Sequence, residues 1–92
     1  MLIKQGIMKV DFSKIQMKTI TGDMEAVDLR TAVGNILYMQ GMNIKECSLG
    51  LDVFHSDGPM ELSDEQTAIV RAYVKRLPYV FQEAVERALE EQ

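Results

Sequence analysis

The sequence has few of the residue types on which cofactor, metal or covalent chemistry depends. Its 92 residues include one cysteine, one histidine, two prolines and no tryptophan. The lone Cys47 excludes an internal disulfide framework and predicts a reducing compartment, where such a thiol is a small buried side chain. Because nucleophilic and metal sites need several groups at set spacings, a single histidine, His55, leaves too few residues for either. We predict no cofactor, no catalytic residue and no metal site, and therefore not an enzyme.

Long hydrophobic runs are also absent. Hydrophobic residues make up 47% of the chain and charged residues 26%, as in an average globular protein. No run approaches the length of a membrane span. The first residues lack the charged start and the long apolar stretch of a secretory signal. These absences predict a small soluble protein, cytoplasmic and without a membrane partner.

The chain length predicts one domain. About ninety residues can enclose one modest core but not two. Residues 8–92 are predicted to form this single domain. Residues 1–7 show no periodicity and are predicted to be a disordered or non-native extension, which leaves Met1 and Met8 as alternative native starts.

Charge is distributed unevenly along the sequence. The net charge is −4, which repels phosphate backbones and disfavours nucleic acid as a partner. The first 22 residues nevertheless carry four lysines against one acid. Lys9, Lys14 and Lys18 therefore remain the candidate contacts of a nucleic-acid partner, should there be one.

The N-terminal part is predicted to be extended chain. Apolar and polar residues alternate over 9–18, which is typical of half-buried strand. Gly22 suits the first central position of a two-residue type II′ turn, so residues 14–28 are predicted to form a hairpin with Thr19 opposite Ala26. Residues 60–62 follow a turn signal and predict a short third strand at the edge of this hairpin.

Two helices are predicted in the middle of the chain. Asp28 can cap a helix over 29–40, in which an internal glycine at Gly34 indicates close approach of another backbone. Asn43 can cap a second helix over 44–55. Apolar residues also alternate in 44–55, so a strand remains the alternative there.

The clearest local sequence pattern lies at the start of the C-terminal segment and indicates the beginning of a helix. Ser63 and Gln66 form a capping box, which predicts a helix start. Apolar residues then recur at heptad-like spacing and form an apolar seam, and this spacing continues unchanged on both sides of Pro78. We therefore expect a long helix that is kinked or broken at Pro78. The predicted fold is α+β and mostly helical: an N-terminal hairpin packed against three to four helices.

In its order of predicted elements and in two short sequence segments, the chain resembles small uncharacterised proteins of bacterial prophages and mobile elements. The resemblance covers a short basic hairpin, the segment Gly-Asn-Ile-Leu-Tyr at 34–38, and Met-Glu-Leu-Ser-Asp-Glu at 60–65 opening a C-terminal helix. It implies a bacterial cytoplasm and an interaction role, but no shared activity.

A broad apolar face on the C-terminal helix predicts an interaction with a protein partner or a second copy of the chain. The candidate interaction surface comprises Val70, Tyr73, Val74, Leu77 and Phe81. Tyr38, Met39 and Met42 are interpreted as core filling rather than as a methionine-rich binding surface.

Overall fold

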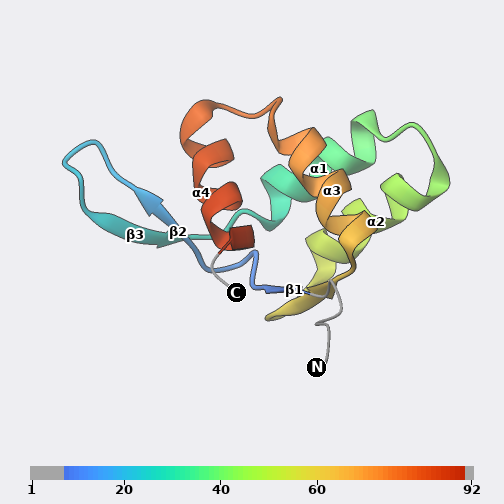
Figure 1. Cartoon of the computed structure of the whole chain (residues 1–92), viewed down its shortest axis with the longest axis horizontal. Coiled ribbons are helices and arrows are strands. Elements are labelled where there is room, and N and C mark those ends of the chain that lie inside the picture. The colour runs from blue at the N-terminus through green and yellow to red at the C-terminus, as the bar shows by residue number, and fades with distance from the viewer. Residues whose placement is uncertain (1–7, 91–92) are drawn as a thin grey trace, which may run out of the picture.

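The computed structural model describes residues 8–90, which form four helices and four short strands (Figure 1). The elements are β1 (Met8–Val10), β2 (Ile15–Lys18), β3 (Met24–Val27), α1 (Arg30–Gln40), α2 (Ile44–His55), β4 (Met60–Leu62), α3 (Asp64–Val74) and α4 (Tyr79–Glu90). The mostly helical α+β fold with an N-terminal hairpin is as the sequence predicted. The prediction for residues 1–7 falls outside the described residues.

The strands form two separate antiparallel pairs. β2 pairs with β3, whereas β1 pairs with β4, so the prediction that β4 extends the hairpin is wrong. A tight turn between β1 and β2 explains the difference. The carboxylate of Asp11 accepts from the backbone N–H and the hydroxyl of Ser13, and the carbonyl oxygen of Asp11 accepts from the N–H of Lys14. This turn redirects the chain, so that β1 and β2 find different partners.

The hairpin closes with a longer loop than predicted. Lys18 pairs with Met24, and the N–H of Thr19 donates to the carbonyl oxygen of Asp23 at 2.7 Å, which leaves residues 20–22 as the loop. The N–H of Gly22 donates to the carbonyl oxygen of Thr19 at 2.9 Å. Gly22 has φ +95°, which is typical of a three-residue hairpin loop that ends in a left-handed glycine. The predicted two-residue turn and its register are therefore wrong. The observed register places Ile15 opposite Val27.

Side-chain caps fix the starts of α2 and α3. Asn43 Oδ1 accepts from the N–H of Glu46 at 2.9 Å, and residues 44–55 are helical, which excludes the strand alternative. The capping box of Ser63 and Gln66 is present in both directions. At α1 the N-cap residue is Leu29, one position later than predicted, although Asp28 still accepts from the N–H of Arg30 at 3.0 Å.

The C-terminal segment is broken rather than kinked. α3 ends at Val74 and α4 begins at Tyr79, directly after Pro78. A proline lacks the N–H that a continuous helix needs and disfavours helical geometry in the residue before it. Figure 1 shows α4 folded back beside the rest of the bundle, next to the hairpin. Both helices can therefore contact one core.

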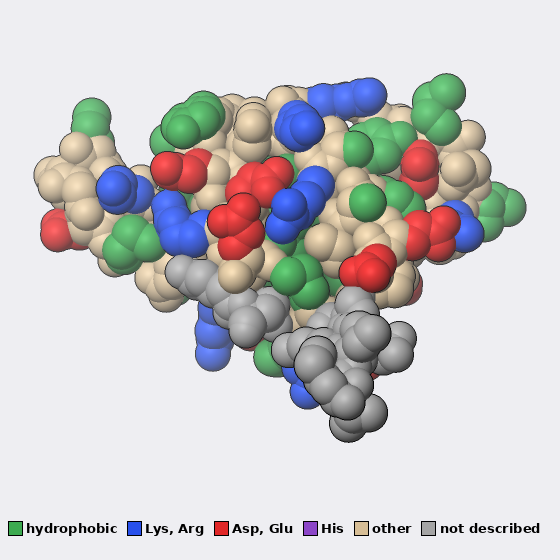
Figure 2. Space-filling view, in the orientation of Figure 1, with side chains coloured by type: hydrophobic (Ala, Val, Ile, Leu, Met, Phe, Trp, Pro, Cys, Tyr) green, Lys and Arg blue, Asp and Glu red, His purple; other side chains and the backbone are tan. Residues whose placement is uncertain are grey.

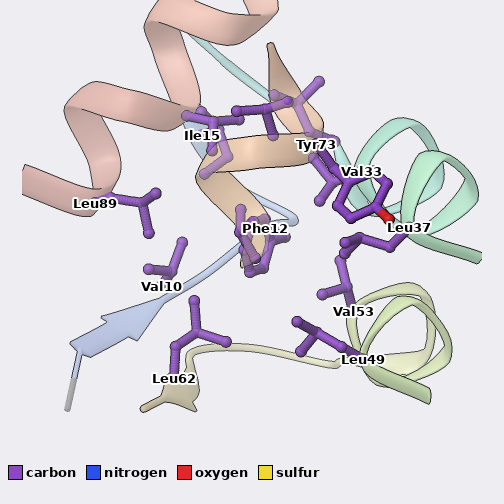
Figure 3. Packing of buried hydrophobic residues seen from close by; sticks show 14 of the residues in the cluster. Val10, Phe12, Ile15, Val33, Leu37, Leu49, Val53, Leu62, Tyr73 and Leu89 are labelled. Carbon is purple, nitrogen blue, oxygen red and sulfur yellow. The ribbon is translucent and has the colours of Figure 1, made fainter. Parts of the chain in front are cut away.

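The core is a single apolar cluster around Phe12 (Figure 3). Side chains from β1, β4, α1, α2, α3 and α4 converge on it, and no polar or charged residue among 8–90 is fully buried. The buried hydrophobic residues are Val10, Phe12, Ile15, Leu29, Val33, Leu37, Leu49, Val53, Leu62, Val70, Tyr73, Val74, Ala84, Val85 and Leu89.

Candidate functional site

The two central helices cross in backbone contact at a pair of glycines. α1 and α2 are joined by a three-residue turn, and Gly34 and Gly50 are both buried where the helices meet. A Cβ on Gly34 would lie 2.9 Å from the carbonyl oxygen of Gly50, and a Cβ on Gly50 would lie 2.7 Å from that of Gly34. The close backbone approach predicted at Gly34 is confirmed, and no larger residue fits at either position.

The side of this helix pair that faces away from the core is apolar. Six hydrophobic side chains there are between 45% and 85% exposed to solvent, and we call them the α1–α2 face. They are Tyr38, Met39, Met42, Ile44, Leu51 and Phe54. Hydrophobic side chains stand out from the surface at the end of the molecule formed by the α1–α2 turn (Figure 2). Tyr38, Leu51 and Phe54 line one hollow of this face, whereas Met39 lines a second hollow of about 410 Å³ beside Leu77. Exposed hydrophobic side chains gathered on one part of a surface mark a site of association.

A shallow hollow of about 190 Å³ lies within the α1–α2 face. It is lined by Gly34 and Gly50, where the helix backbones are in contact, and by the side chains of Tyr38, Leu51 and Phe54. A hollow lined by apolar and aromatic side chains suits an inserted hydrophobic side chain. The polar side chains of Asn35 and His55 also line the hollow.

The interpretation of the methionines near this turn as core filling is wrong. Met39 is 74% exposed and Met42 is 85% exposed, and Tyr38 is half exposed. Periodicity alone failed here because α1 uses its opposite side, with Val33 and Leu37, for the core. Exposed methionine is typical of adaptable binding surfaces.

Hydrogen bonds from α3 hold the α1–α2 turn in place. The hydroxyl of Tyr73 donates to Oε1 of Glu46 at 2.7 Å, and its oxygen also lies 3.2 Å from the carbonyl oxygen of Gln40. The same Glu46 oxygen accepts from the N–H of Met42 at 2.7 Å. Arg76 donates to the side chain of Gln40 and lies over the Tyr73 ring, 5.0 Å from its centroid. The exposed side chains of the turn are therefore presented from a fixed backbone.

These bonds make the turn sensitive to acid. The N–H of Met42 and the hydroxyl of Tyr73 hold the pKa of Glu46 below its ordinary value, since both donate to the carboxylate. The stabilisation is complete above the ordinary glutamate range and is lost as the pH falls through the lowered pKa. Donation to Glu46 raises the pKa of Tyr73, so the phenol stays protonated beyond its ordinary range.

Replacing Glu46 with glutamine is expected to flatten the acid limb of the stability profile, because the amide oxygen can still accept both hydrogen bonds but does not titrate. Urea unfolding midpoints measured between about pH 5 and pH 2 test this. Glu25→Gln, which removes an exposed carboxylate from β3, is the matched control and should keep the parental acid limb. An E46Q profile as steep as that of the parent would contradict the assignment.

The partner surface predicted on the C-terminal segment is corrected by the structure. Val70 and Val74 are fully buried, and Tyr73 is 6% exposed. Leu77 and Phe81 are partly buried and pack against the same core. The break at Pro78 lets α3 and α4 fold back onto one cluster, so the seam that looked available for a partner is used within the chain.

The three candidate lysines are exposed but only two lie together. Lys9 on β1 and Lys14 before β2 line a hollow of about 140 Å³ together with Arg87 of α4. Asp11 also lines it and reduces its positive charge. Lys18 lies farther along β2, outside this lining. Arg87, which the sequence analysis did not select, comes from the far end of the chain.

The remaining candidates for chemistry do not form a site. Cys47 is half-buried, with Sγ 3.5 Å from the carbonyl oxygen of Tyr38, and exposed His55 ends α2 with its ring edge-on to Phe54. Within residues 8–90, no three His, Cys, Asp or Glu side chains are grouped so that they could hold a metal ion. None of the helices in this part of the chain is long and apolar enough to cross a bilayer.

Comparison with known proteins gives no match to a family model, to a curated protein or to a solved structure.

Proposed function

We propose that the chain is a non-catalytic protein-interaction module of a bacterial prophage or mobile element, and that it acts in the cytoplasm by binding a protein through the α1–α2 face. The observation that carries the proposal is the set of six exposed hydrophobic side chains on α1, α2 and their connecting turn, of which Tyr38, Leu51 and Phe54 line the hollow at the Gly34–Gly50 crossing. Leaving so much apolar surface in water opposes solubility, so its retention is explained by a partner that covers it.

Preorganisation of this face supports the proposal. The glycine crossing fixes the two helices against each other, and the Tyr73 and Glu46 hydrogen bonds fix the turn that carries Met42. Because the backbone of this face is already ordered, binding a partner costs little conformational entropy. More of the interaction free energy then contributes to affinity. Tyr38 and Phe54 beside the hollow are the aromatic anchors that dominate many interfaces.

Site-specific photocrosslinking tests the proposal in cells that express the chain. A photoreactive residue in place of Leu51, within the face, should give a discrete protein adduct whose mass identifies the partner. The same residue in place of Ala68, exposed on α3, should give none. Equal adducts at both positions, or none at Leu51, would contradict binding through the α1–α2 face.

Nucleic-acid binding is a second candidate, supported by the basic hollow between the first strands and α4. Lys9, Lys14 and Arg87 bring three positive charges to one place despite the net charge of −4. If this hollow contacts phosphates, duplex DNA should bind at low ionic strength, and Lys14→Glu should weaken it uniformly across sequences. Absence of salt-dependent binding to duplex and single-stranded DNA would remove this candidate.

A further inference from the structure

We infer that the protein bound at the α1–α2 face is a second copy of this chain, with the α2 helices of the two copies antiparallel about a two-fold axis. This inference rests on the proposed function and names its partner. In such a dimer the same surface is used twice, so the face must supply both the hollow and the side chain that enters it.

The exposed apolar area is of the size that a dimer requires. Judged by the areas that large hydrophobic side chains bury, the six residues of the face offer roughly 700 Å², close to the ~800 Å² per partner of a standard interface. The other exposed large hydrophobic side chains of residues 8–90 are fewer: Ile20 and Met24 in the hairpin, and Tyr79 with Val80 at the start of α4. Among the described residues, the α1–α2 face therefore offers the largest set of exposed hydrophobic side chains.

The outermost line of α2 suits close helix packing. Ile44, Ser48 and Leu51 recur at spacings of four and three, so they lie along one side of the helix, and all three are exposed. The small Ser48 near the middle lets a second helix approach closely. The larger Leu51 and Phe54, on the rim of the hollow, are then placed to enter the corresponding hollow of the partner.

Charges on one flank of α2 select the antiparallel arrangement. Lys45 and Asp52 are seven residues apart, so they lie on the same flank, and both are exposed. About a two-fold axis near Ser48, Lys45 faces Asp52 of the partner subunit, and the pair occurs twice. In a parallel two-fold arrangement this flank would instead lie against the opposite flank of the partner helix, so Lys45 and Asp52 would not form these pairs.

The groups in these pairs are free to form them. Lys45 contacts Glu65 at 3.1 Å, but both side chains are 64% exposed, and such surface ion pairs contribute little. Asp52 has no hydrogen-bond or ion-pair partner within residues 8–90. Pairing across the interface therefore breaks no strong contact within the subunit.

Sedimentation of the full chain over a concentration series tests the inference. The parent should show a reversible monomer–dimer equilibrium. Leu51→Asp should raise the dimer Kd by about 100-fold or more, because it puts a charge at the centre of an apolar contact. Tyr79→Asp, at an exposed hydrophobic side chain outside the face, is the matched control and should leave Kd unchanged. Circular dichroism verifies that each variant is folded.

Charge reversal tests the orientation. Lys45→Asp and Asp52→Lys should each raise Kd by about tenfold, because each places two like-charge contacts in the dimer. The double variant K45D/D52K restores opposite charges and should return Kd to within about threefold of the parent. Double-variant Kd values no lower than those of the single variants would overturn the antiparallel arrangement.

The outcomes separate this inference from the proposed function. A strict monomer at high micromolar concentration, with a Leu51 adduct to a different protein, would overturn the second-copy inference and leave the interaction module standing. A monomer with no adduct at Leu51 would overturn both. A concentration-dependent dimer that Leu51→Asp leaves intact would place the contact elsewhere and overturn the inference.

Discussion

Phe12→Ala is expected to lower the free energy of unfolding by about 3–5 kcal/mol, the usual cost of removing a buried aromatic ring. Phe12 is fully buried at the centre of the cluster, between the two strand pairs and the helices. The backbone around it has little freedom to close the cavity, because the carbonyl oxygen of Phe12 accepts from the N–H of Leu29 at 2.8 Å. Urea unfolding followed by circular dichroism measures the effect.

Phe54→Ala is the matched control for this prediction. The same ring is removed, but Phe54 is 45% exposed on the α1–α2 face, so the loss should stay below about 1 kcal/mol. Equal losses in F12A and F54A would show that stability does not follow the burial described here. F54A also removes an aromatic wall of the hollow, so it should weaken self-association while leaving the domain folded.

Gly50→Ala is expected to lower the free energy of unfolding by about 3 kcal/mol through overpacking. The new Cβ would meet the carbonyl oxygen of Gly34 at 2.7 Å and the backbone nitrogen of Tyr38 at 2.8 Å. Backbone atoms cannot swing aside as a flexible side chain can, so α1 and α2 must separate. This loss outweighs the ~1 kcal/mol by which alanine favours a helix over glycine.

Gly58→Ala provides the comparison, because nothing lies within 4 Å of a Cβ at that position and its backbone has no positive φ. Its unfolding midpoint should match or slightly exceed that of the parent. A G50A variant as stable as G58A would contradict the backbone contact between the helices. A destabilised G50A should also lose the hollow on the α1–α2 face and associate less tightly.

Features with local causes were predictable from the sequence. The caps of Asn43 and Ser63 involve residues three positions apart, and both were found where expected. The close backbone approach at Gly34 follows from the cost of an interior glycine in a helix. The interruption at Pro78 follows from the missing N–H of proline.

Features with distant causes were not predictable. The partner of β4 depends on the Asp11 turn, which directs β1 away from β2 some fifty residues earlier in the chain. The hairpin register was misjudged because neither face of the ribbon is cleanly apolar, which leaves register weakly specified.

Apolar periodicity likewise identifies a helix face without saying what covers it. The seam through Val70 and Val74 is covered by the chain itself, whereas Met39 and Leu51 are left in solvent. The α1–α2 face therefore emerged only when the helices were placed against one another.

The pairing of β1 with β4 also sets an order of events during folding. Met8 pairs with Leu62 and Val10 with Met60, so this contact closes a span of 50 to 54 residues, whereas α1 and α2 are joined by only three. Closing a long span costs more chain entropy and slows the step that requires it. During folding, the helical pair can therefore form before β1 meets β4. The surface that we assign to self-association is then available early, while the core is still incomplete.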